Sequence, residues 1–162
     1  MRRWNGWGDV STQYPLPVSA AAFLESRLGS GKPAPAPDLA SLAGQVSISD
    51  LPAHPLISTN AEDRLRHAHG QSLPDWVALR SGRLGPIPEA VAYPKTDADV
   101  RQFLEFADHY QLIVIPYGGG TSVVGHINLL PGSARALSID MSGMNRLLNL
   151  DETSHLACFQ AG

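Results

Sequence analysis

The sequence predicts a mixed α/β fold, preceded by a helical and proline-rich N-terminal segment. Two short apolar runs, at residues 90–93 and 112–115, flank a stretch with helical periodicity. Two further strand-like runs follow toward the end of the chain. Because a strand–helix–strand unit joins parallel strands, we expect a sheet that is at least partly parallel.

Composition places the chain among globular proteins. Apolar residues make up 43% of its 162 positions, enough for a packed core. The formal net charge of -3 offers no basic surface, so nucleic acid is not expected as a partner. A single cysteine excludes an internal disulfide and a cysteine-rich zinc site. No apolar run reaches the roughly 18 residues of a membrane span, and no secretory signal begins the chain. A cytoplasmic location is therefore expected.

Residues 1–82 predict a helical and irregular segment. Ser19 can cap a short helix that Gly29 ends. The alternating Pro and Ala of residues 29–38 favour an extended linker. A second short helix is expected after Asn60.

Two other features of this segment lead to expectations. Trp4 and Trp7 are large aromatics near a terminus, and we expect them to anchor it onto the body. Gly70, Pro74 and Gly82 are expected to interrupt regular structure.

Residues 83–162 predict the first part of a domain, which we expect to continue beyond this chain. Residues 90–93 form a strand between two prolines, and Thr96 caps the helix after it. That helix has one apolar face, made of Val100, Phe103, Leu104 and Ala107. The β-branched run 112–115 then predicts a fully buried strand.

The remaining strands are expected at residues 137–141 and 156–161. The stretch between them, residues 142–154, is expected to be a connection that turns near Asp151. Cys158 lies in the last strand and is expected to be a small buried residue.

A glycine-rich loop directly follows the strand at 112–115. Gly118, Gly119 and Gly120 remove every Cβ, so a ligand can approach backbone N–H groups, and Thr121 and Ser122 add hydroxyl donors. This chemistry suits a phosphate or pyrophosphate. The spacing is neither that of a nucleotide-hydrolysing P-loop nor that of a Rossmann fingerprint. A glycine turn that serves only packing stays open from the spacing alone.

Longer segments carry a family resemblance. The loop PYGGGTSVVG is similar to the FAD-pyrophosphate loop of flavoproteins of the vanillyl-alcohol oxidase and p-cresol methylhydroxylase (PCMH) type. RWNGWGD, EDRLRHAHGQSLPDWVALRSG, PEAVAYPKTDADVRQFLEFADHY and SIDMSGMNRLLNLDETSHLACFQAG resemble segments of the alkylglycerone-phosphate synthase group within that superfamily.

The resemblance implies a PCMH-type FAD-binding domain, of which this chain holds the first βαβ-containing subdomain. It implies that the FAD pyrophosphate lies against Pro116, Tyr117, Gly118, Gly119, Gly120, Thr121, Ser122 and Val123. Pro94 and Lys95 are expected to border the cofactor. Many members tether flavin through a histidine in or beside this loop; Tyr117 and glycines stand here, so FAD is expected to bind non-covalently.

The sequence also departs from the family pattern. His126 stands where many relatives carry a second glycine, and it can contact the flavin. A second departure lies in the stretch around Ala68, His69 and Gly70, here called the AHG segment. In it, His67 stands where arginine is expected and Gln71 where histidine is common.

For function, the resemblance implies an FAD-dependent enzyme of ether-lipid synthesis. It would exchange the acyl chain of acyl-dihydroxyacetone phosphate for a fatty alcohol, without net oxidation. The alternatives are an FAD-linked dehydrogenase or oxidase of a 2-hydroxy acid such as D-lactate or glycolate, and an inactive truncated product. The substrate is expected to be a small or lipid-like molecule, and a homodimer of the full-length protein stays open. The family's catalytic residues lie beyond residue 162, so none is named here.

Two other groupings of polar residues were weighed. His67 and His69 form an H-x-H pair that lacks a third ligand, so no metal site is predicted. Asp140 and Asp151 can be read as an acid–base pair, but are expected to end a strand and to form a turn.

Overall fold

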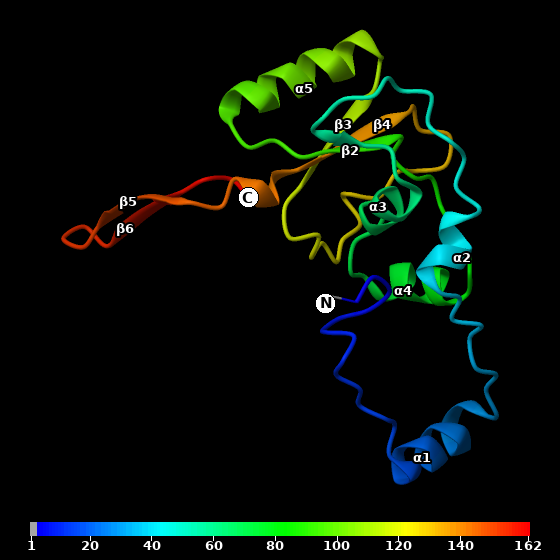
Figure 1. Ribbon diagram of the computed structural model, residues 1–162. Coiled ribbons are helices and arrows are strands. Elements are labelled where there is room, and N and C mark those ends of the chain that lie inside the picture. The colour runs from blue at the N-terminus through cyan, green and yellow to red at the C-terminus, as the bar shows by residue number, and fades with distance from the viewer. Residues whose placement is uncertain (1–2) are drawn as a thin grey trace.

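A computed structural model describes residues 3–162. Its centre is a four-stranded sheet in the order β1–β2–β4–β3, with helix α5 on one face (Figure 1). The buried core beneath α5 comes from alternate residues of β2 and β4 and from one face of the helix; it includes Ala90, Ala92, Phe103, Ala107, Leu137 and Ile139. Elsewhere, α3 contacts β2, and Ile127 of the loop that follows β3 packs against Ile115 and Ala136 of the sheet.

Helix α5 (Asp97–His109) forms as predicted. The Thr96 hydroxyl accepts from the Asp99 amide, and the Asp99 carboxylate accepts from the Thr96 amide, which makes a capping box. Phe103 and Ala107 lie on its buried face. The helix ends before Gln111, which adopts a positive φ of 52° and turns the chain into β3.

The parallel sheet is confirmed, with a different strand order. β2 (Ala90–Ala92) and β3 (Ile113–Tyr117) are not neighbours, because β4 (Ala136–Asp140) lies between them and is parallel to both. The short strand β1 (Ile57–Ser58) adds to β2 antiparallel. Central β4 is buried along its whole length.

The prediction that residues 112–115 form a fully buried strand is wrong in part. β3 is an edge strand, and within it only Ile115 is buried, whereas Ile113 is 43% exposed. A β-branched run therefore marks the strand correctly but not its place in the sheet, which depends on strand order.

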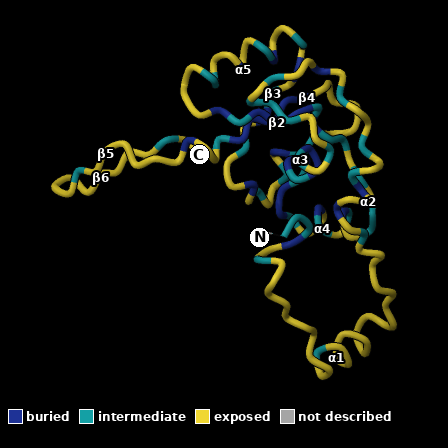
Figure 2. The backbone as a smooth tube through the Cα atoms, viewed as in Figure 1, coloured by how far each residue is buried: buried dark blue, intermediate teal, exposed yellow. Residues whose placement is uncertain are grey.

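The N-terminal segment contains four helices. α1 (Val18–Leu28) follows Pro17, which makes no side-chain cap, so the predicted Ser19 cap is wrong; Gly29 ends the helix as predicted. The helix contributes no buried residue and stands away from the body (Figure 2). α2 (Leu39–Ala43), capped by Asp38, was not predicted.

Helices α3 (Ala61–Arg66) and α4 (Leu73–Arg80) lie closer to the sheet. Asn60 caps α3 as predicted, by accepting from two amides of its first turn. α4 was missed because Pro74 was read as an interruption. Proline is tolerated in the first helical turn, where its missing N–H has no helical partner to lose.

The expected aromatic anchoring is confirmed. Trp7 packs edge-to-face against Trp76 of α4, with ring centroids 4.4 Å apart. Trp4 packs against the cluster formed by Leu39, Leu42 and Leu65.

The last two strands form a hairpin that projects from the body (Figures 1 and 2). β5 (Leu147–Asp151) was predicted as a connection, so that prediction is wrong. The predicted turn at Asp151 is confirmed, because its carboxylate accepts from two amides in the turn. In β6 (Leu156–Phe159) Cys158 is exposed, not buried, as are the other three residues of the strand.

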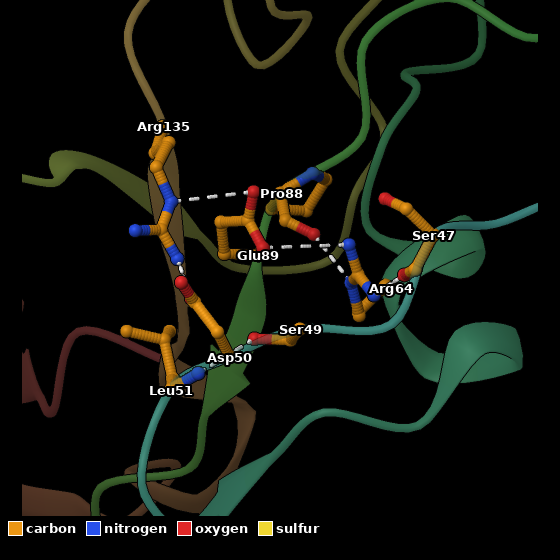
Figure 3. A network of polar contacts seen from close by, with 8 residues as sticks. All are labelled: Ser47, Ser49, Asp50, Leu51, Arg64, Pro88, Glu89 and Arg135. Atoms are coloured by element: carbon orange, nitrogen blue, oxygen red, sulfur yellow. Dashed lines mark hydrogen bonds and ion pairs between the residues drawn. The ribbon is translucent and has the colours of Figure 1, made fainter.

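A polar network ties the amino-terminal ends of β2 and β4 to the N-terminal segment (Figure 3). Arg64 of α3 is only 2% exposed, and its guanidinium donates to the carbonyls of Pro88 and Ser47, each at 2.7 Å. Glu89 lies between Arg64, at 3.8 Å, and Arg135, at 3.4 Å. Burial lowers the pKa of Arg64, and Glu89 partly opposes that shift. The residues of this network that Figure 3 labels are Ser47, Ser49, Asp50, Leu51, Arg64, Pro88, Glu89 and Arg135.

None of the helices in the described part of the chain is long and apolar enough to span a bilayer.

Candidate functional site

The glycine-rich loop begins at the carboxyl end of the parallel strands. β3 ends at Tyr117, which lies opposite Asp140, the last residue of β4. Ligands in α/β folds bind at this edge, because the loops that leave the strands open a crevice there. The fold therefore places the predicted loop where a ligand site is expected.

The glycines of the loop have different roles. An ideal Cβ built at Gly118 meets no atom within 4 Å, so the absence of a side chain leaves open space. At Gly120 the same Cβ would lie 2.0 Å from the Tyr117 hydroxyl, and φ is +60°. Gly120 is therefore needed for the chain to turn back over the Tyr117 ring, whereas Gly118 keeps the approach to the backbone clear.

Two cavities meet at this loop, at Gly118 and Gly119. A cavity of about 390 Å³ is lined by Pro116, Gly118, Gly119, Gly120, Thr121, Ser122, Val123, Val124, His126 and Ile127. A second, of about 290 Å³, lies between the loop and the N-terminal segment, and is lined by Arg3, Trp4, Arg66, His67, Gln71, Tyr117, Gly118, Gly119, Asp140 and Ser142. Every predicted cofactor-binding residue thus lines a cavity, and Gly118 and Gly119 line both. Whether FAD contacts them stays a prediction.

The AHG segment supports the loop from behind. The Gln71 amide donates to the Ser122 carbonyl at 2.6 Å, and the Gly70 amide donates to the Asn128 side chain at 3.1 Å. The Asn128 amide group donates in turn to Asp75 at 2.6 Å. These bonds hold both ends of residues 122–128 against α4 and the turn before it.

A buried pair joins the same two regions. His67 Nε2 lies 2.8 Å from Asp140 Oδ2, and its other ring nitrogen lies 2.7 Å from the Asp63 carbonyl oxygen. The His67 ring packs on Tyr117, with centroids 4.3 Å apart, and meets Tyr93 edge-on at 5.9 Å.

The electrostatics of this cluster follow from its burial. Burial alone raises the pKa of Asp140, but hydrogen bonds from His67 and Ser142 outweigh it and hold that pKa below its ordinary value. Burial is the main cause that raises the pKa of Tyr93 well above its ordinary value, and the negative charge of Asp63 adds to it. Asp140 is therefore a carboxylate and Tyr93 a neutral phenol near pH 7.

The other histidine of the segment, His69, has a different environment from His67. No group of three metal-binding side chains occurs in residues 3–162. His69 Nε2 is buried without a hydrogen-bond partner among the described residues, and burial lowers the pKa of the ring against an opposing effect of Asp75.

Asp140 and Asp151 do not form an acid–base pair. Asp140 is bonded to His67, and Asp151 forms the turn of the exposed hairpin. Both follow the structural alternative that the sequence favoured.

The outlying predicted residues are less closely tied to the loop. His126 lines the 390 Å³ cavity, and its ring lies 3.4 Å from the Ser122 hydroxyl. Lys95 lines a separate cavity of about 860 Å³ between the start of α5 and the hairpin, which no residue of the glycine loop borders. Contact of Pro94 and Lys95 with a cofactor stays a prediction.

Sequence reasoning missed the His67–Asp140 pair and Arg66. The two members of the pair are 73 positions apart, and no spacing rule links them. Arg66 lines the 290 Å³ cavity and has no carboxylate partner in the described part of the chain. Its position directly before His67 is the one signal that pointed to it.

Comparison with known proteins gives a family match for the C-terminal part of the chain and relatives for nearly all of it. Residues 88–162 match the FAD binding domain family. The alkyldihydroxyacetonephosphate synthase of Trypanosoma brucei brucei is 28% identical over 99% of this chain and 32% of its own length. The synthase of Dictyostelium discoideum is 33% identical over 61% of this chain and 16% of its own length.

Solved structures also match nearly the whole chain. An alkyldihydroxyacetonephosphate synthase structure superposes over 98% of this chain and 34% of its own, with a TM-score of 0.78 and 25% identity. The fold is therefore that of a PCMH-type FAD-binding domain. The alignments cover between 16% and 34% of the length of these relatives. A mitochondrial D-lactate dehydrogenase [cytochrome] of Arabidopsis thaliana is also similar, at 38% identity, but over only 38% of this chain. The domain division at residues 82 and 83 stays a prediction.

Proposed function

We propose that the complete gene product holds FAD non-covalently, with the pyrophosphate in the 390 Å³ cavity of residues 88–162, which match the FAD binding domain family. The observation that carries this proposal is the open space at Gly118, beside hydroxyl donors at Thr121 and Ser122. A loop that served only packing has no need of a bare position facing a cavity.

The residues present fit such a group. Thr121 and Ser122 donate hydrogen bonds to phosphate oxygens, and Arg66 supplies a positive charge in the adjoining cavity. His126 is the one histidine in the lining of the cavity, and it lies beyond the glycines. When bound, FAD supplies a ring that accepts electron pairs; this chain's part is to bind and orient it.

The binding mode has a direct test. The complete gene product is purified, its visible spectrum is recorded, and the protein is then precipitated with acid. Flavin absorbance in the native spectrum that passes into the supernatant supports non-covalent FAD. Flavin that stays in the pellet points to a tether, with His126 the first position to examine. A colourless protein that takes up no added FAD overturns the proposal.

For activity, we propose the alkyl transfer that the synthase relatives are named for, on a small lipid-like phosphate ester. What favours it is the extent of the similarity: the synthase aligns with 99% of this chain, including the AHG segment that supports the loop. The dehydrogenase aligns with 38%. The 2-hydroxy-acid dehydrogenase is the second candidate, because it shares the FAD binding domain.

One assay separates the two. The complete gene product is incubated with an acyl-dihydroxyacetone phosphate and a labelled fatty alcohol, and separately with D-lactate and an electron-accepting dye. Label in an ether product without dye reduction supports alkyl transfer. Dye reduction without ether product favours the dehydrogenase. A cytoplasmic location and a homodimer stay predictions.

A further inference from the structure

The His67–Asp140 pair lies at the junction of two parts of the chain. His67 is the residue that ends α3, and Asp140 ends β4. Both are buried, at 6% and 8% exposure. The second oxygen of Asp140 accepts from the Ser142 amide at 2.8 Å, so the carboxylate is held from both sides.

The geometry favours one charge state of His67. Both of its ring nitrogens face oxygen acceptors, one a carbonyl and the other a carboxylate. A neutral imidazole has a single N–H and satisfies one of them, whereas an imidazolium satisfies both. The buried carboxylate also needs a positive partner. The pair is therefore complete when His67 is protonated.

Groups from several elements surround His67. They are the backbone carbonyl of Asp63 in α3 and the side chains of Tyr93, after β2, Tyr117 of β3 and Asp140 of β4, with Arg66 and Arg3 on the shared cavity. Tyr93 is neutral and Asp140 ionised near pH 7, as described above. Histidine is the side chain that ordinarily changes charge between about pH 5 and 8.

The pair reaches the glycine loop through one ring. His67 packs on Tyr117 at 4.3 Å, and the Tyr117 hydroxyl donates to the Arg66 carbonyl at 3.4 Å. The loop turns over this ring at Gly120, where even a Cβ would collide with the hydroxyl. A shift of the Tyr117 ring therefore displaces the backbone of the loop.

We propose that the His67–Asp140 ion pair positions Tyr117 and the glycine loop for FAD, so that FAD binds best when His67 is protonated. This rests on the proposed function for the identity of the ligand. His67 is a positioning residue: it acts through Tyr117 and is not assigned a contact with FAD.

The test is FAD affinity as a function of pH. Apoprotein of the complete gene product is titrated with FAD between pH 6 and 9, and flavin fluorescence is followed. The wild-type dissociation constant is expected to rise with pH. His67→Gln loses the charge, and its dissociation constant is expected to be about tenfold higher at pH 6 and nearly independent of pH. Asp140→Asn, which keeps the shape of the side chain, is expected to flatten the profile as well.

The matched control is His109→Gln, because His109 is exposed at the end of α5. It is expected to keep the wild-type profile. If His67→Gln does not fold, the double variant His67→Gln/Asp140→Asn removes both buried charges together and takes its place. A wild-type affinity that is flat with pH, or a His67→Gln profile as steep as the wild type, overturns the proposal.

A second readout does not depend on FAD. Amide hydrogen exchange of residues 117–128 in the apoprotein is compared between His67→Gln, His109→Gln and the wild type at one pH. Faster exchange in His67→Gln alone supports the positioning role, and equal exchange in all three overturns it. If the wild type binds no FAD, the proposed function fails, and this comparison still decides the inference.

Discussion

Gly70 lies so close to Ser122 that an ideal Cβ built at position 70 falls 2.3 Å from the Ser122 carbonyl oxygen. Two segments that are far apart in the chain thus touch through their backbones. We expect Gly70→Ala to push the glycine loop off the AHG segment and to lower the free energy of unfolding by about 1–3 kcal/mol. Thermal or urea unfolding measures this. Gly31→Ala is the control, because a Cβ there meets nothing within 4 Å; equal effects of the two changes would contradict the close contact.

Gly118 and Gly120 are expected to respond oppositely to alanine. At Gly118 there is open space and no positive φ, so Gly118→Ala should change the free energy of unfolding by less than about 0.5 kcal/mol. Its methyl group projects into the proposed pyrophosphate site, and FAD affinity should fall about tenfold, or about 1.4 kcal/mol.

Gly120→Ala should instead lower stability by about 1–3 kcal/mol, from its positive φ and the collision with Tyr117. Urea unfolding and FAD titration of both variants test the pair of predictions. A Gly118→Ala protein that binds FAD as the wild type does would show that the pyrophosphate lies elsewhere.

We expect that replacing Arg64 even by lysine lowers the stability of the protein. Its guanidinium bonds two carbonyls on different segments, and a lysine ammonium has neither the planar shape nor the reach to keep both. Arg64→Lys should lower the free energy of unfolding by about 2–4 kcal/mol. Arg83→Lys, at an exposed position, is the matched control and should have little effect. An equal tolerance at both positions would remove Arg64 from the set of structural residues.

Asp140 is expected to contribute to the pH dependence of stability. Its pKa is lowered in the folded protein, so its ionised form favours folding. The contribution is fully present above its unfolded pKa of about 3.9, and is lost as pH falls through the lower folded value. Asp140→Asn should therefore be less stable than the wild type at neutral pH, and the difference should shrink below about pH 4. A difference that stays constant down to acid pH would contradict this.

The 162-residue chain by itself is expected to bind FAD weakly and to self-associate. The β5–β6 hairpin exposes apolar side chains on both strands, namely Leu147, Leu148, Leu150, Leu156 and Phe159. Exposed apolar strands pair readily with other chains. Replacing Leu156 and Phe159 by lysine should reduce association in light scattering, whereas Leu28→Lys, at an exposed site on α1, should not. A clean monomer at high concentration, or a stoichiometric flavin complex, would count against the prediction.

Local sequence signals located most of the FAD-binding part of the fold. Thr96 gave the start of α5 correctly, because a helix cap depends only on neighbouring residues. The prediction that β3 is fully buried was wrong, because its place in the sheet is set by pairing with residue 136 and beyond. The prediction that Cys158 is buried was wrong for a similar reason, since burial of β6 depends on what packs against the hairpin.

The same distinction holds for the candidate site. The glycine loop could be found from a run of adjacent residues, and the structure places it at the edge where ligands bind. His67 and Asp140 were each considered in the sequence, but separately, His67 in an H-x-H pair that was not predicted to bind metal and Asp140 as a strand end. Their pairing requires knowing that α3 packs beside the end of β4, and no local pattern contains that information.

The position of β4 between β2 and β3 also bears on how the protein is made. When the ribosome has released β2, α5 and β3, no strand yet joins β2 to β3, and the core beneath α5 still lacks Leu137 and Ile139. The sheet closes only once residue 140 has emerged, and the same event delivers Asp140 to His67. Folding during synthesis is therefore expected to wait on this strand, and until it arrives the nascent chain presents apolar surface to chaperones.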